Sequence, residues 1–164
     1  MTISMLLLIA ATLLCGLTTG LVFAFTVVVM PGLRTLPDRE FLSSFKAIDR
    51  IIQNNDPLFL LAWVGSVILL IVAGIMNVAV LPGTPRLLLI GAVGSYLLGV
   101  QLPTFVVNVP LNNRLQAIEL PALDAGALRK AREAFESRWL YWNAFRTVFG
   151  LLTTVLLLAV VHVS

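Results

Sequence analysis

Four long apolar stretches separated by shorter polar segments dominate the chain. They cover approximately residues 3–30, 58–81, 87–107 and 139–163. The first three contain no charged residue, and the fourth carries Arg146 near its start. A helix needs about 20 apolar residues to cross the hydrocarbon core of a bilayer, so each stretch is long enough for one span. The pattern therefore predicts four membrane-spanning helices.

Two segments between the spans are amphipathic. In residues 38–53, apolar side chains recur at helical spacing and polar ones lie opposite. The apolar stripe consists of Phe41, Phe45, Ile48 and Ile52, and the polar side of Arg39, Ser43, Lys46 and Arg50. We expect this helix either to lie along the membrane interface or to fold under the bundle. Residues 122–138 are also amphipathic, and a long helix is predicted to run from them into the fourth span.

The composition decides the class of protein. Hydrophobic residues make up 59% of the 164 residues and charged residues 12%. This charged fraction is about half of the roughly 25% usual in soluble domains, which excludes both a soluble domain and a disordered chain. We predict a single domain, residues 1–164, with an all-α fold. It is an integral membrane four-helix bundle with amphipathic helical segments on the cytoplasmic side.

The basic residues predict the orientation. All of them except Arg86 fall between the first and second spans, or between the third and fourth spans and the start of the fourth. Such loops face the cytoplasm under the positive-inside rule. We therefore expect a multi-pass protein of the cell membrane with both termini outside and two basic loops in the cytoplasm. This loop bias explains the net charge of +3, so no nucleic-acid partner is predicted.

Few residues in the sequence could hold a metal ion. With Cys15 and His162 as the only residues of their kinds, neither a disulfide nor a Cys/His metal site is expected, and no cofactor is predicted.

Small residues mark one face of each of two predicted spans. Glycines or serines recur every four residues on the first and third stretches, at Gly16 and Gly20 and at Gly91, Ser95 and Gly99. Such faces favour close helix packing, either inside one bundle or in a homo-oligomer.

Polar residues gather near the cytoplasmic end of the third span. Asn108 and Asn112 flank Pro110, which cannot donate a backbone hydrogen bond and disfavours helix at Val109. We therefore expect an irregular chain there, which is tolerated only inside protein or beside a polar cavity. The two asparagines either satisfy this backbone or donate to a ligand.

Arg146 lies at a similar predicted depth in the fourth span. An Arg inside a span is costly unless it reaches the interface, pairs with an anion or faces a cavity. Asn143 and Trp142 precede it by three and four residues, so both are its neighbours on the helix surface. Both snorkelling to the cytoplasmic interface and a role in a ligand site are compatible with this position.

Several of these motifs together resemble a known family. They are Gly16-Leu17-Thr18-Thr19-Gly20, Phe23-Ala24-Phe25, Val29-Met30-Pro31-Gly32-Leu33, Ile52-Gln53-Asn54, Asn108-Val109-Pro110-Leu111-Asn112 and Trp142-Asn143-Ala144-Phe145-Arg146-Thr147. The chain resembles the anthrone-oxygenase-like group of small membrane proteins over nearly its whole length. The resemblance implies a four-helix membrane domain. A few fungal members are associated with the oxidation of anthrones to anthraquinones without an obvious cofactor, so the resemblance also implies this activity. Some family oxygenases carry a His near the last motif, where this chain has Ala144 and Phe145.

Two hypotheses of function follow. In the first, the protein oxygenates a lipophilic polycyclic phenol or anthrone taken from the bilayer, without a cofactor. The candidate catalytic residues are Arg146, Asn108, Asn112 and Asn143, which would hold a developing oxyanion. Trp142, Trp139 and Phe25 are candidates for contact with the aromatic substrate. No base is evident in the sequence. In the second hypothesis, the protein is a non-catalytic binding, transport or helper protein of the membrane.

Overall fold

The computed structural model describes residues 2–163 and is helical over most of that range. In chain order the helices are α1 (Ile3–Ala24), η1 (Phe25–Val29), α2 (Met30–Arg34), α3 (Asp38–Gln53), α4 (Pro57–Val78), α5 (Gly83–Gly94), η2 (Ser95–Gln101), η3 (Thr104–Asn108), α6 (Val109–Gln116), η4 (Leu120–Ala122) and α7 (Ala125–Val163). Of these, η1, η2 and η3 are π-helical and η4 is a 3-10 turn. The predicted all-α fold is confirmed.

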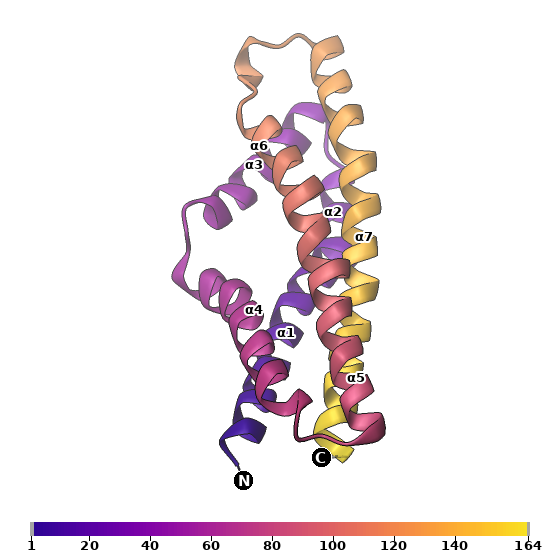
Figure 1. Ribbon diagram of the computed structural model, residues 1–164. Helices are drawn as coiled ribbons and strands as arrows, with labels where there is room; N and C mark the ends of the chain where they lie inside the picture. Colours follow the sequence, from indigo (N-terminus) through magenta and orange to yellow (C-terminus); the bar gives the residue numbers. More distant parts are fainter. Residues whose placement is uncertain (1, 164) are drawn as a thin grey trace.

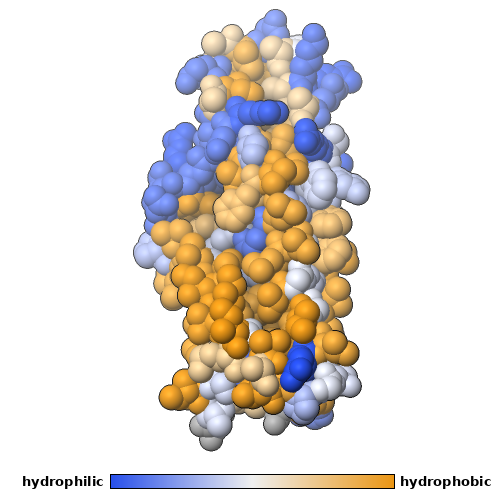
Figure 2. All heavy atoms as spheres, viewed as in Figure 1, coloured by the Kyte–Doolittle hydropathy of each residue, from blue (hydrophilic) through white to orange (hydrophobic). Residues whose placement is uncertain are grey.

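These elements join into helices long and apolar enough to cross a membrane. They are Ile3–Arg34, Pro57–Val78, Gly83–Gln116 and Ala125–Val163. Figure 1 shows α7 running the length of the bundle and both chain ends lying at the same end of it. In Figure 2 apolar residues cover the part of the surface nearer the chain ends, and hydrophilic residues gather at the opposite end. The predicted four-helix membrane bundle is therefore confirmed.

The amphipathic helix α3 folds under the bundle. Its apolar residues Phe41, Leu42 and Phe45 are buried. The Phe45 ring packs against α7, with centroids 4.6 Å from Phe135 and 5.3 Å from Trp139. Buried aromatic pairs of this kind add to the free energy gained from area burial. Of the two predicted placements, the structure thus selects packing against the ends of the membrane helices rather than an exposed position along the interface.

The chain around Pro110 is helical, so the prediction of an irregular backbone there is wrong. Val109 has φ −61° and ψ −47°, and helix α6 begins at this residue. The reason is the π-helical turn η3, in which the Val109 N–H reaches back to the carbonyl of Thr104. A proline normally loses one helical hydrogen bond and clashes with the carbonyl four residues earlier, and a wider turn relieves both problems. Pro31 and Pro103 also follow π-helical turns, η1 and η2.

The two small-residue faces serve different purposes. On the third membrane helix, Ser95 donates to the carbonyl of Phe149 on α7 at 3.1 Å, and a Cβ on Gly99 would lie 2.3 Å from the Phe149 ring. This face therefore packs inside the bundle. A Cβ on Gly16 or Gly20 of α1 would meet no atom within 4 Å. The face on α1 is thus open, and a homo-oligomer formed through it stays a prediction.

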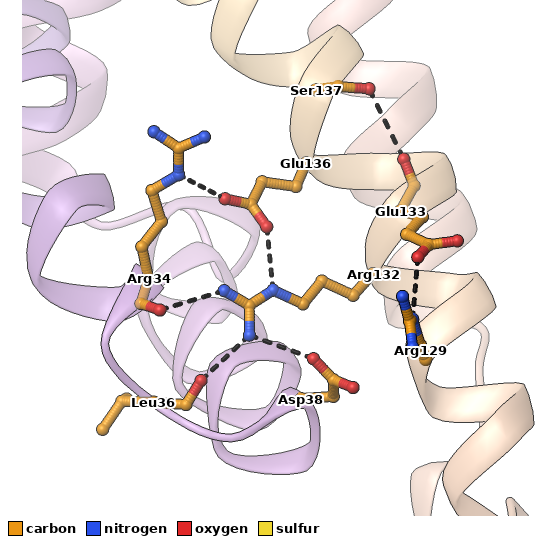
Figure 3. A network of polar contacts seen from close by, with 8 residues as sticks. All are labelled: Arg34, Leu36, Asp38, Arg129, Arg132, Glu133, Glu136 and Ser137. Atoms are coloured by element: carbon orange, nitrogen blue, oxygen red, sulfur yellow. Dashed lines mark hydrogen bonds and ion pairs between the residues drawn. The ribbon is translucent and has the colours of Figure 1, made fainter.

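A polar network ties the α2–α3 connection to α7 beyond the apolar part of the bundle (Figure 3). The Arg132 guanidinium donates to Asp38 at 3.0 Å and to Glu136 at 2.8 Å. It also donates to the backbone carbonyls of Leu36 at 2.9 Å and Arg34 at 3.1 Å. Because the Arg132 side chain is only 16% exposed, it holds these elements together with little screening by solvent.

Replacing Arg132 by glutamine is expected to destabilise the fold by about 1–3 kcal/mol, because it removes charge-assisted hydrogen bonds to the α2–α3 connection. The matched control is Arg129→Gln on the same helix, because the Arg129 side chain is 75% exposed and pairs with Glu133 one turn along the helix surface. Thermal unfolding in detergent should show a lower midpoint for Arg132→Gln and an unchanged one for the control. Equal midpoints would contradict a structural role for the network.

Candidate functional site

A cavity lies where α3 meets the membrane helices, and we call it the junction cavity. Its volume is about 280 Å³, near the lower limit of roughly 300 Å³ for small-molecule sites. Its apolar walls include Leu21, Val22, Phe25, Phe45, Phe59, Trp63 and Trp139. Its polar lining residues are Asp49, Asn55, Thr104, Asn108, Asn112, Asn143 and Arg146. An apolar enclosure with a few convergent polar groups is typical of a ligand site.

The junction cavity reaches the outer surface of the bundle between α4 and η3. Val64 and Phe105 line it and are 46% and 64% exposed. Both belong to helices long and apolar enough to span the membrane, so their exposed sides face lipid if the bundle lies in a bilayer. In Figure 1 the first turns of α4 diverge from the third membrane helix. A lipophilic ligand could therefore reach the cavity from the bilayer.

Arg146 is buried in the bundle, which rules out the snorkelling alternative. The whole Arg146 residue is only 5% exposed. Its Nη1 donates to Thr104 Oγ1 at 2.9 Å and its Nη2 to Asn143 Oδ1 at 2.6 Å, while its Nε has no partner among the described residues. No carboxylate forms an ion pair with it within residues 2–163. A buried cation without an anion is costly, so the site is suited to an anionic partner.

Asn143 acts as a support for Arg146. Its Oδ1 accepts from Arg146, and its Nδ2 donates to the carbonyl of Val22 at 2.9 Å and to Thr26 Oγ1 at 2.8 Å. Because an amide nitrogen carries two hydrogens, both donors of Asn143 are already used within the protein. Asn143 therefore orients the guanidinium and ties α7 to α1, and it has no amide hydrogen left for a ligand.

Asp49 of α3 is a buried carboxylate in the same cavity. The residue is 3% exposed. Its Oδ1 accepts from Asn112 at 2.7 Å, and its Oδ2 accepts from Gln53 at 2.7 Å and from Gln116 at 2.8 Å. Neutral amides thus surround it, and no Lys or Arg within the described range forms an ion pair with it. The junction cavity therefore contains an acid and a cation that are held apart.

Trp139 and Asn112 connect the two sides of the cavity. Trp139 Nε1 donates to Asn112 Oδ1 at 2.8 Å, which leaves the Asn112 amide nitrogen to face Asp49. The Arg146 guanidinium lies 5.9 Å from the centroid of the Trp139 ring, within the range of a cation–π contact. The Trp139 ring therefore contacts the Arg146 guanidinium. Its N–H orients Asn112, which in turn donates to Asp49.

The other candidate residues divide between the cavity and its surroundings. Phe25 lines the cavity and packs against Trp139, with ring centroids 5.6 Å apart. Asn108 also lines it, and its Oδ1 has no partner among the described residues, whereas its Nδ2 lies 3.4 Å from the carbonyl of Trp139. Trp142 does not line it and packs instead against Tyr141 and Phe145. The structure thus brings together every candidate except Trp142.

Asp49 is not among the site residues predicted from the sequence, because it lies within a segment rich in charged residues. The signal was present, however: Asp49 follows Phe45 by four residues and Ile48 by one, so it belongs to the apolar stripe of α3. A carboxylate on a buried helix face needs partners, and Gln53 supplies one from the next turn. Its other two partners come from α6 and could not be assigned from local spacing.

Comparison with known proteins identifies the family of the chain. Residues 57–156 match the family described as anthrone oxygenase. The chain belongs to the anthrone oxygenase family. No curated protein and no solved structure matches it. The part of the chain that matches the anthrone oxygenase family includes the cavity residues Thr104, Asn108, Asn112, Trp139 and Arg146. Asp49 also lines the cavity but precedes the matched part.

No metal site accompanies these residues in the part of the chain that the structure describes. Within residues 2–163, no three or more His, Cys, Asp or Glu side chains lie close enough together to hold a metal ion. Asp49 is the carboxylate that lines the junction cavity. A guanidinium, amides and the Thr104 hydroxyl line the same apolar space.

Proposed function

We propose that this member of the anthrone oxygenase family converts a lipophilic anthrone or related polycyclic phenol to a quinone inside the membrane, without a cofactor. The observation that carries the proposal is Arg146. Arg146 is buried and lines the cavity, its Nε has no hydrogen-bond partner among residues 2–163, and no carboxylate within those residues forms an ion pair with it. Such a group stabilises an anion far more strongly in an apolar cavity than it would in water.

The chemistry requires an anion because a neutral anthrone reacts slowly with oxygen. Loss of a proton from the methylene carbon of anthrone gives an anion delocalised onto the carbonyl oxygen. The anion is oxidised by O2, a C–O bond forms at the former methylene carbon, and loss of water gives the quinone. Overall, one anthrone and one O2 give one anthraquinone and one water. Arg146 would hold the oxygen on which the negative charge develops.

Supports for the substrate are already present around this cation. Phe25 and Trp139 offer aromatic surfaces within the cavity, and aromatic rings favour offset or edge-to-face contact with a flat substrate. Thr104 and Asn143 fix the guanidinium, so that little reorganisation is needed when charge develops. Asn108 also lines the cavity, and its Oδ1 has no hydrogen-bond partner among the described residues.

The proposal is tested by oxygen uptake and quinone absorbance with detergent-purified protein and a panel of anthrones. We expect uptake above the spontaneous rate, with one quinone formed for each O2 consumed. Uptake at the spontaneous rate by folded protein that binds the anthrone would contradict oxygenation. It would favour the alternative of a binding, transport or helper protein.

We also propose that the chain ends lie outside the cell and that the end containing α3 lies in the cytoplasm, as the basic loops indicate. In a Cys15→Ala background, a cysteine at exposed Thr84 should react with a membrane-impermeant maleimide on intact cells. A cysteine at exposed Ser137 should react only after the cells are lysed. The reverse labelling pattern would contradict this orientation.

A further inference from the structure

We propose that Asp49 is the general base that removes the proton from the substrate in the junction cavity. The inference rests on the proposed function, since it supplies the step for which the sequence offered no group. It assigns opposite tasks to the two charged residues of the cavity. Asp49 receives the proton, and Arg146 holds the negative charge that the proton leaves behind.

The first argument is the position of Asp49. It is 3% exposed, whereas the other charged residues of its helix are exposed or half-buried, and it lines the cavity that also contains Arg146. Acidic residues are almost never fully buried unless they are paired. Within residues 2–163, its side-chain hydrogen-bond partners are amides, which do not neutralise its charge. A purely structural position would be filled at lower cost by an apolar residue.

The second argument is the hydrogen-bonding capacity of the carboxylate. A carboxylate has about four acceptor positions, two on each oxygen. Gln53 and Gln116 both donate to Oδ2, whereas Asn112 alone donates to Oδ1. The protein thus saturates one oxygen and leaves an acceptor position on the other. A base needs an uncommitted lone pair of this kind to accept a proton.

The third argument is the separation of Asp49 from Arg146. Opposite charges attract strongly in an apolar cavity, yet the two side chains form no ion pair. Thr104 and Asn143 hold the guanidinium, and Asn112 with the two glutamines holds the carboxylate. The space between them suits a weak acid. Transfer of its proton to Asp49 replaces the carboxylate by a new anion close to Arg146.

The proton balance is complete without a further group. The C–H bond of the substrate breaks, its electron pair remains as the delocalised anion, and the proton forms an O–H bond on Asp49. After O2 has oxidised the anion and the C–O bond has formed, that proton returns to the peroxide oxygen. The second C–H bond at that carbon then breaks, its electron pair forms the C=O bond as the O–O bond breaks, and the departing hydroxide combines with the second proton to give water. Asp49 ends the cycle as a carboxylate.

Proton transfer is measured separately from oxygenation by hydrogen–deuterium exchange. Anthrone is incubated under nitrogen in D2O with the detergent-purified full chain, and deuterium in its methylene group is followed by mass spectrometry. We expect the native protein to catalyse exchange above the spontaneous rate. Asp49→Asn should lower the catalysed rate about 100-fold or more, the usual contribution of a positioned general base.

Two controls separate proton transfer from folding. Glu40→Gln changes an exposed carboxylate on the same helix and should leave the exchange rate unchanged. Asp49→Ala should be inactive alone but regain exchange when formate is added, because formate can occupy the space of the missing carboxylate. Quenching of tryptophan fluorescence by anthrone shows that each variant still folds and binds the probe.

The outcomes distinguish the two proposals. Catalysed exchange that is lost in Asp49→Asn and restored by formate supports Asp49 as the base, even if the protein consumes no O2 in air; in that case only the oxygenase proposal fails. Catalysed exchange that persists in Asp49→Asn overturns the assignment of Asp49 and leaves the oxygenase proposal intact. Absence of exchange with native protein that binds anthrone also overturns it.

Discussion

Replacing Arg146 by glutamine is expected to lower kcat/KM for anthrone oxidation about 100- to 1,000-fold, the usual effect of losing one donor to a developing oxyanion. Glutamine can still donate to a neighbour, but it carries no charge and its amide is shorter than the guanidinium. The anion formed from the substrate would then be stabilised only by the neutral amides that remain. Steady-state oxygen uptake, with anthrone concentration varied, measures this effect.

The fold should survive this substitution. Arg146 is buried and has no counter-ion among residues 2–163, so its removal relieves a desolvation cost as well as removing two hydrogen bonds. Arg138→Gln, at an exposed position on the same helix, serves as the matched control and should retain native activity. Native turnover by Arg146→Gln would refute the role of this cation in the reaction.

Replacing Gly99 by alanine is expected to destabilise the bundle by about 1–3 kcal/mol, the typical cost of overpacking a well-packed interior. The added Cβ would lie 2.3 Å from Cγ and 2.4 Å from Cβ of Phe149. Rotation of the Phe149 side chain cannot move its Cβ, so the third membrane helix and α7 must shift apart. A lower midpoint of thermal unfolding in detergent would record this loss of stability.

Gly94 provides the matched control for that experiment. It lies five residues earlier on the same membrane helix, and a Cβ there would meet no atom within 4 Å. Gly94→Ala should be neutral or slightly stabilising, because alanine favours helix over glycine. If Gly99→Ala and Gly94→Ala had the same midpoint, the close approach of Gly99 to α7 would not limit stability.

Features that repeat along one helix were predictable from the sequence. The apolar stretches determine the membrane helices, since each must satisfy its backbone hydrogen bonds internally in lipid. The stripe of Phe41, Phe45 and Ile52 likewise predicts α3 from local spacing alone. The helical structure around Pro110 could not be predicted in this way. The proline penalty is local, whereas the π-helical turn that relieves it includes the buried residues Thr104, Val107 and Asn108.

The candidate site shows the same division. Arg146, Asn108 and Asn112 stand out because polar residues in or near apolar stretches are costly, so the sequence by itself marks them and places the chain near its family. The pairing of Asp49 with Asn112 and Gln116, and the use of Trp139 rather than Trp142, depend on how α3 and α6 meet α7. These contacts join residues far apart in the chain. Only the tertiary structure decides them, because burial and hydrogen-bond geometry between helices are not encoded in local periodicity.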